Sequence, residues 1–336
     1  MNPELSSFSL ILETVNLELA ELDGLRDSLT SIADQNVDVR SACEILMVEG
    51  GDVPKDKLAE ITRDFPWLSI IEVPPGTGYE EAKMLGAARC SGEIVVYFDA
   101  DCRYEKTWLR SLLEGFKQHP EIGVLGGETM IRADSVIGLA TCVLFTFNFY
   151  SDRQSIYDHD RIHLNNAAFR RAVLEKYPFQ TGLALFRMSS RLYVEQLKKA
   201  GIRVARQPKS RALHAPPNGL GHFFWRFLMF GHDAVNVYRI ADAANQQSTG
   251  QPPTRGRFLG RLVSLIGDRG SKIFSRLIWL IRDNPRHALR LPLALPLIGI
   301  GAFLMLVGYL SALFFPGLLP SLMPGSIQRG ADYAQR

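Results

Sequence analysis

Four apolar runs near the start of the chain alternate with amphipathic helical patterns, and this rhythm constrains the fold more than any other feature. The expected strands are Ser7–Leu12, Glu44–Val48, Leu68–Val73 and Ile94–Phe98. The expected helices are Glu18–Gln35, Lys55–Phe65, Tyr79–Arg89 and, after the fourth strand, Thr107–His119. Alternation of this kind is typical of a parallel sheet covered by helices. The sequence therefore predicts an α/β fold.

The fourth run ends abruptly in two carboxylates, Asp99 and Asp101, which are one residue apart. In open α/β sheets, ligands bind beyond the carboxyl ends of the strands, so both acids are expected where a ligand would lie. Oxygen donors at this spacing suit a hard divalent ion, Mg²⁺ or Mn²⁺, which can then hold a diphosphate. The alternative is an ordinary strand-to-loop turn, where Asp is common. A motif this short does not decide between the two by itself.

The surrounding segments resemble the family 2 glycosyltransferases. A glycine-containing turn and helix, Gly76 to Arg89, precede the Gly92-Glu93 start of the strand, as they do in that family. The segment Asn165 to Leu174 is similar to the family's acceptor-side segment, and the resemblance covers residues 7 to 230. It implies a GT-A fold, which is a Rossmann-like, mostly parallel sheet with helices on both faces. It also implies an inverting, metal-dependent transfer of a sugar from a nucleotide-diphosphate sugar, with a UDP-sugar as the expected donor.

The chain is expected to divide into four parts. Residues 1–230 form the glycosyltransferase domain, with a nucleotide-sugar half over 1–104 and an acceptor half over 105–230. Residues 231–290 are expected as basic amphipathic interfacial helices with a linker, 291–320 as a transmembrane segment and 321–336 as a short tail. Residues 1–60 hold thirteen acids and four bases, whereas residues 252–290 hold nine bases and two acids. The net charge of +3 therefore conceals an acidic front and a basic rear.

An uncharged stretch from Leu291 to Gln328 follows the basic segment. Pro292 and Pro296 are expected to disrupt the beginning of this stretch. Pro316 is expected to stop a helix that begins near Leu297, so the 19 residues Leu297–Phe315 would form a helix of about 28 Å, close to the hydrocarbon thickness of a bilayer. This length predicts a membrane span, with a buried core helix as the alternative.

The basic segment predicts where the protein resides. Its arginines place the catalytic domain on the cytoplasmic face of the inner or plasma membrane, and the four cysteines, which lack a paired framework, agree with a reducing compartment. Apolar residues between Phe258 and Ile281 alternate with the arginines and predict two short helices in the headgroup region. Because membrane contact explains the positive charge, no nucleic-acid partner is expected.

The resemblance implies donor-binding and metal-binding residues. The donor-binding candidates are Glu13, Glu49, Lys83, Asp99, Asn165 and Asn166, and the metal-binding candidates are Asp99, Asp101 and His214. Glu49 stands where the family usually has Asp, and it could equally be a solvated turn residue. The two asparagines could equally be turn formers. His214 could ligate the metal through a neutral imidazole or be a hydrogen-bonded loop residue.

The general base of the family is missing from its usual place. Family members carry a Glu-Asp pair about twelve residues before the glycine that ends the following helix. Counting back from Gly201 reaches Ser189-Ser190, and neither serine acts as a base at neutral pH. His232 and Asp233 follow His214 in the chain and are the tentative base and its charge partner. The alternative reading of these two residues is a surface or capping role.

Two functions remain open at this point. The first is a transferase acting on a membrane-associated glycan or lipid-linked acceptor in cell-envelope polysaccharide synthesis. It is expected to be non-processive, because the Q-x-x-R-W string of processive synthases is missing. The second is a catalytically degenerate GT-A protein that serves as a non-enzymatic membrane or complex subunit. A phosphotransferase with Asp99 as nucleophile is disfavoured, since no hydroxyl residue closely follows Asp101 to support a phosphoenzyme.

Overall fold

The computed structural model describes residues 5–14, 22–144, 147, 149–183, 185–186, 188–249 and 272–322. Its first half contains the predicted strands β1 (Phe8–Glu13), β2 (Ile45–Glu49), β3 (Ser69–Glu72) and β4 (Ile94–Phe98). Between them lie α1 (Leu22–Ala33), α2 (Lys55–Asp64) and α3 (Tyr79–Ala87). All three strand pairings, β1 with β2, β1 with β4 and β2 with β3, are parallel. The predicted parallel, helix-covered arrangement is confirmed.

The second half of the chain extends the same sheet with mixed strand directions. Its strands are β5 (Cys102–Tyr104), β6 (Ile122–Ile131), β7 (Tyr157–Asp158), β8 (Asn166–Arg170) and β9 (Arg203–His214). The strand order is β3-β2-β1-β4-β8-β6-β9-β5, with β7 paired to β9. β8 is antiparallel to both β4 and β6, whereas β9 is parallel to β6. β5 pairs with β9 so that Cys102 faces His214, which brings the end of β9 beside the acids that follow β4.

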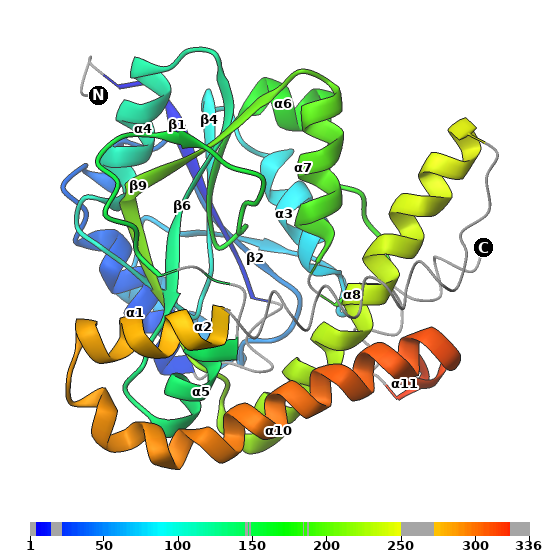
Figure 1. Ribbon diagram of the computed structural model, residues 1–336. Helices are drawn as coiled ribbons and strands as arrows, with labels where there is room; N and C mark the ends of the chain where they lie inside the picture. Colours follow the sequence, from blue (N-terminus) through cyan, green and yellow to red (C-terminus); the bar gives the residue numbers. More distant parts are fainter. Residues whose placement is uncertain are drawn as a thin grey trace.

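Helices cover both faces of the sheet (Figure 1). The remaining helices are α4 (Trp108–Gln118), α5 (Val136–Leu144), α6 (Arg171–Lys176), α7 (Ser189–Lys199), α8 (Gly219–Thr249), α10 (His287–Phe314), α11 (Leu318–Ser321), a short 3-10 helix η2 (Val39–Ser41) and a helix over residues 272–283. On one face, Leu29 of α1 and Trp108 of α4 pack against Leu10 and Val96. On the other face, α3 and α7 pack against the alternate residues of the same strands. Burial on both faces explains why the central strands read as continuous apolar runs.

The C-terminal apolar segment differs from the prediction in one respect. α10 begins at His287 and passes through both Pro292 and Pro296, so the expected disruption at these prolines is wrong. Ala294 and Ile298 are buried against α5, α8 and the helix over residues 272–283, and this packing offsets the backbone hydrogen bonds that the two prolines remove. Within the described part of the chain, α10 is the one helix that is long and apolar enough to cross a membrane.

α10 is attached to the domain along one of its faces. A Cβ at Gly308 would overlap the carbonyl oxygen of Leu228 in α8, and a Cβ at Gly231 would overlap the carbonyl of Met305, so both glycines permit a close helix contact. The opposite face of α10 is exposed and carries Leu293 and Phe303. The predicted boundary at residue 230 falls inside α8. Of the two predicted headgroup helices, the one around Phe258 lies outside the described residues.

Candidate active site

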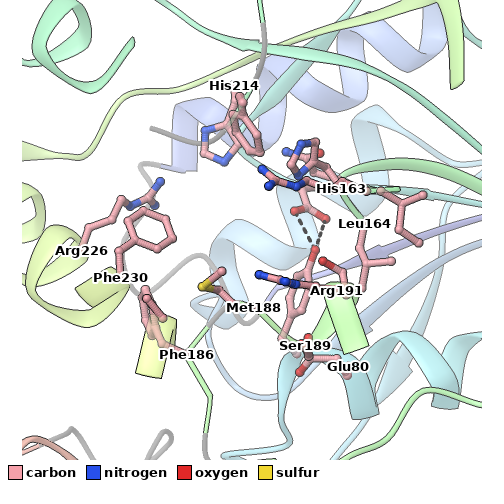
Figure 2. A pocket seen from close by; sticks show the side chains of 18 of the residues that line it. Glu80, His163, Leu164, Phe186, Met188, Ser189, Arg191, His214, Arg226 and Phe230 are labelled. Carbon is pink, nitrogen blue, oxygen red and sulfur yellow. Dashed lines mark hydrogen bonds between the residues drawn. The ribbon is translucent and has the colours of Figure 1, made fainter. Parts of the chain in front are cut away.

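A cavity of about 200 Å³ lies beyond the carboxyl end of β4. Its wall combines residues from segments far apart in the sequence: Tyr79 and Glu80 of α3, Asp99 and Asp101 after β4, Asn165 before β8, Ser189 and Arg191 of α7, His214 at the end of β9, and Arg226 and Tyr238 of α8. Figure 2 shows His214 at one end of this cavity, with Glu80 and Ser189 together at the other end. The cavity therefore joins the two acids predicted from the strand motif to the α7 segment where the general base was expected.

Lys83 forms the centre of a buried ion-pair cluster. Its Nζ lies 2.7 Å from Asp99 Oδ1 and 3.9 Å from Glu13 Oε1, and both Lys83 and Glu13 are fully buried. The Tyr79 hydroxyl donates to Asp99 Oδ2 over 3.1 Å. Asp99 is therefore held by protein groups on both carboxylate oxygens. The predicted donor-site residues Glu13, Lys83 and Asp99 meet where the carboxyl ends of β1 and β4 lie against the middle of α3.

Asp101 and His214 form a second pair at the same edge of the sheet. His214 Nε2 lies 3.2 Å from Asp101 Oδ2, and both side chains are almost buried. His214 Nδ1 lies 2.6 Å from the carbonyl oxygen of Ala215, which fixes Nδ1 as the protonated nitrogen. In a neutral ring, the lone pair of Nε2 then points at a carboxylate oxygen. Two acceptors so close together suit a cation between them, so this donor set fits a divalent metal ion.

Cys102 is the third potential ligand at this place. The ligating atoms of Asp101, Cys102 and His214 all lie within 4.8 Å of one another. Burial raises the pKa of the Cys102 thiol well above its ordinary value. The thiol donates a long hydrogen bond of 3.6 Å to Asp101 Oδ1. The groups best placed to hold a metal are therefore one carboxylate and one imidazole.

The two predicted asparagines have different surroundings. Asn165 lines the cavity, and its Oδ1 accepts a hydrogen bond of 3.3 Å from Thr129. Asn166 is fully buried, and its Oδ1 accepts from Trp108 Nε1 over 2.8 Å. Its Nδ2 donates to the carbonyl oxygens of Glu128 and Ser210. The amide of Asn166 thus bridges β8, β6 and β9 and has no free group to offer a ligand.

Glu49 holds its own loop. Its two carboxylate oxygens accept hydrogen bonds from the backbone N–H groups of Gly51 and Val53 over 2.8 and 2.9 Å. Glu49 is buried, so the solvated-turn alternative is wrong for this residue. Gly51 adopts a φ of 95°, which favours glycine in the turn that Glu49 caps.

Ser189 at the start of α7 has an unexpected partner. Its hydroxyl donates to Oε1 of Glu80, which comes from the first turn of α3. Glu80 is not among the site residues predicted from the sequence, although its spacing from Lys83 gives one signal. Glu80 precedes Lys83 by three residues on a helix, and this spacing places the two side chains on neighbouring parts of one face.

His232 and Asp233 belong to α8, and their side chains are buried against neighbouring segments. Both are buried, and neither is among the described residues that line the cavity. Asp233 Oδ1 accepts a hydrogen bond of 3.0 Å from the backbone N–H of Phe186, so this carboxylate ties α8 to the loop before α7. His232 lies 3.5 Å from Asp233 and is also close to Asn236. Their catalytic role stays a prediction.

Comparison with known proteins points to one family. Residues 18–178 match the family model described as glycosyl transferase family 2. Polypeptide N-acetylgalactosaminyltransferase 3 of Taeniopygia guttata is 26% identical over 121 residues, which are 35% of this chain and 18% of that protein. This chain therefore corresponds to less than a fifth of that relative.

Solved structures share the fold. GalNAc-T7 with UDP, GalNAc and Mn²⁺ superposes with a TM-score of 0.53 at 14% identity, covering 64% of this chain and 45% of that chain. TarS 1–349 of S. aureus with UDP-GlcNAc gives 0.51 at 15% identity, covering 69% and 66%. The mannosyltransferase PcManGT of Pyrobaculum calidifontis with GDP-Man and Mn²⁺ gives 0.51 at 17% identity, covering 97% and 86%. The expected GT-A fold is confirmed.

Proposed function

We propose that this chain, whose residues 18–178 match the glycosyl transferase family 2 model and whose fold is GT-A, transfers a sugar from a nucleotide-diphosphate sugar to an acceptor hydroxyl. The observation that carries the proposal is the pair of Asp101 and His214, whose oxygen and nitrogen face each other at the edge of the cavity. A divalent ion, Mg²⁺ or Mn²⁺, bound there would neutralise charge on the departing nucleoside diphosphate. A UDP-sugar is the donor that we propose, since two of the structural neighbours were crystallised with UDP or UDP-GlcNAc.

The buried cluster of Glu13, Lys83 and Asp99 supports the donor side of this proposal. Lys83 is enclosed by Asp99 and Glu13 and lies 4.7 Å from the centre of the Tyr79 ring, so its position is fixed. It holds Asp99 at the carboxyl end of β4, two positions before Asp101, the acid that we assign to the metal. The reaction that we propose is inverting and non-processive, and the acceptor hydroxyl enters from the α7 and α8 side of the cavity.

α8 connects this side of the cavity to the apolar helix α10. Arg226, Phe230 and Tyr238 line the cavity from α8, while Gly231 of the same helix contacts α10. The apolar helix therefore lies one layer behind the acceptor wall of the cavity. On this basis we propose a membrane-associated glycan or lipid-linked acceptor, with α10 attaching the chain to the inner or plasma membrane and the catalytic domain on its cytoplasmic face. Cell-envelope polysaccharide synthesis is the role that we propose.

The direct test is incubation of the full chain and Mn²⁺ with a panel of UDP- and GDP-sugars, followed by measurement of the nucleoside diphosphate released. We expect at least one donor to be turned over. The competing proposal, a degenerate GT-A subunit, is favoured by the serines at positions 189 and 190. It predicts that a donor binds but that none is turned over, and that outcome would contradict the enzymatic proposal.

A further inference from the structure

The cavity contains a carboxylate at the place where the family's base is missing, and this carboxylate belongs to another helix. Glu80 lies in the first turn of α3, 109 residues before its hydrogen-bond partner Ser189. Ser189 is one of the two residues that stand where the resemblance places the Glu-Asp pair. The Ser189 hydroxyl donates to Oε1 of Glu80, and both side chains line the cavity (Figure 2).

The other acids and imidazoles that line the cavity are paired with another side chain or are weak proton acceptors. Within the part of the chain that the structure describes, its remaining carboxylates are Asp99, which is paired with Lys83, and Asp101, which is paired with His214. His163 also borders the cavity. Burial of its ring, together with the nearby Arg206, holds its pKa well below the ordinary value, so it is a weak proton acceptor. Glu80 is partly exposed to the cavity and pairs with a hydroxyl rather than with a cation.

We propose that Glu80 is the general base of the transfer reaction, with Ser189 as the residue that orients it. The acceptor hydroxyl gives its proton to a Glu80 carboxylate oxygen while its own oxygen forms a bond to the anomeric carbon of the donor. The bond from that carbon to the diphosphate oxygen breaks, and the electron pair leaves with the nucleoside diphosphate. This inference depends on the proposed function and adds the residue that completes it.

The position of Glu80 fits this role. It lies at the end of the cavity opposite His214, so the proton is taken up far from the place where the departing diphosphate carries its negative charge (Figure 2). Tyr79, which immediately precedes Glu80 in α3, donates a hydrogen bond to Asp99, so one helix positions both Glu80 and the first acid of the strand motif. The proposed catalytic carboxylate thus comes from α3, whereas the resemblance places it on α7, and both positions border the same cavity.

The test compares Glu80→Gln with Glu81→Gln in the full chain. Glu81 is adjacent and exposed, and its carboxylate accepts a hydrogen bond from the backbone N–H of Gly78 at the start of the same helix, so it is a matched control. The assay follows hydrolysis of the nucleotide sugar that the wild type turns over fastest, with water as the acceptor. We expect kcat of Glu80→Gln to fall by about 10²–10⁴-fold, the usual loss for a general base. Donor affinity in the presence of Mn²⁺ should stay at the wild-type value.

Chemical rescue separates a base from a purely structural residue. Added formate should restore part of the turnover of Glu80→Ala and leave the rate of the wild type unchanged. Turnover of Glu80→Gln equal to that of Glu81→Gln would overturn the proposal. Loss of donor binding together with turnover would also overturn it, because Glu80 would then act in donor binding. If the wild type itself releases no nucleoside diphosphate, the proposed function fails, and this result is distinct because it does not depend on the variant.

Discussion

At the scale of single residues, the site is organised by charges that are buried and paired. Lys83 lies between Asp99 and Glu13, and His214 faces Asp101 with its other ring nitrogen fixed on a backbone carbonyl. Burial of a charge is costly unless a partner compensates it. Each of these side chains therefore keeps its partner in place, and the strand-end acids are presented in one geometry.

Replacement of Lys83 tests this cluster. Lys83→Met should lower the free energy of unfolding by about 3–5 kcal/mol, because it removes the ammonium group that lies between the buried carboxylates of Asp99 and Glu13. The matched control is Lys57→Met in α2, where an exposed pair with Glu60 contributes about 0–1 kcal/mol. Urea unfolding of both variants at neutral pH measures the difference. Equal stability of the two variants would show that the cluster adds nothing to the fold.

At the scale of elements, a helix or strand can be predicted from the sequence when the residues that determine it lie close together in the chain. β1 to β4 and the helices between them follow from apolar periods and turn residues that lie within a few positions of one another. The pairing of β8 between β4 and β6 joins residues such as Ala168 and Leu125, which no local pattern connects. The prolines of α10 show the same limit. Pro292 and Pro296 oppose a helix locally, whereas packing against α5 and α8 stabilises it.

The residues of the candidate site also differ in whether the local sequence predicts them. Asp99 and Asp101 were predictable because a strand and its terminal acids form one short string. His214 was reached through the family resemblance, and its register opposite Cys102 became visible only in the structure. The contact between Glu80 and Ser189 joins α3 to α7 across the whole middle of the chain, so no spacing in the sequence reveals it.

The exposed face of α10 gives the prediction at this scale. The double change Leu293→Glu and Phe303→Glu places two charges on the apolar face and should release the chain from phosphatidylglycerol-containing vesicles in a flotation assay. The physical reason is that each apolar side chain contributes about 1.5–3 kcal/mol when it leaves water. Leu85→Glu on α3 is the control, since Leu85 is also exposed but lies on the catalytic domain. Flotation of the double variant together with the wild type would contradict membrane attachment through this face.

At the scale of the whole molecule, one edge of the mixed sheet carries both the buried ion-pair cluster and one wall of the cavity. The carboxyl ends of β1 and β4, together with α3, hold the buried ion-pair cluster, Asp101 follows at the edge of the cavity, and α7 and α8 close the cavity from the other side. α8 then links the cavity wall to α10 through close glycine contacts. The apolar α10 thus lies directly behind the part of the cavity wall that α8 forms.

The measurement that tests this account most directly is calorimetric titration of a UDP-sugar into the full chain, with and without Mn²⁺, for the wild type and for Asp101→Ala. The account predicts Mn²⁺-dependent binding to the wild type and its loss in Asp101→Ala, while the circular dichroism spectrum and the unfolding transition stay unchanged. Binding to Asp101→Ala that equals the wild type and still depends on Mn²⁺ would contradict the central claim, because the metal would then be held elsewhere.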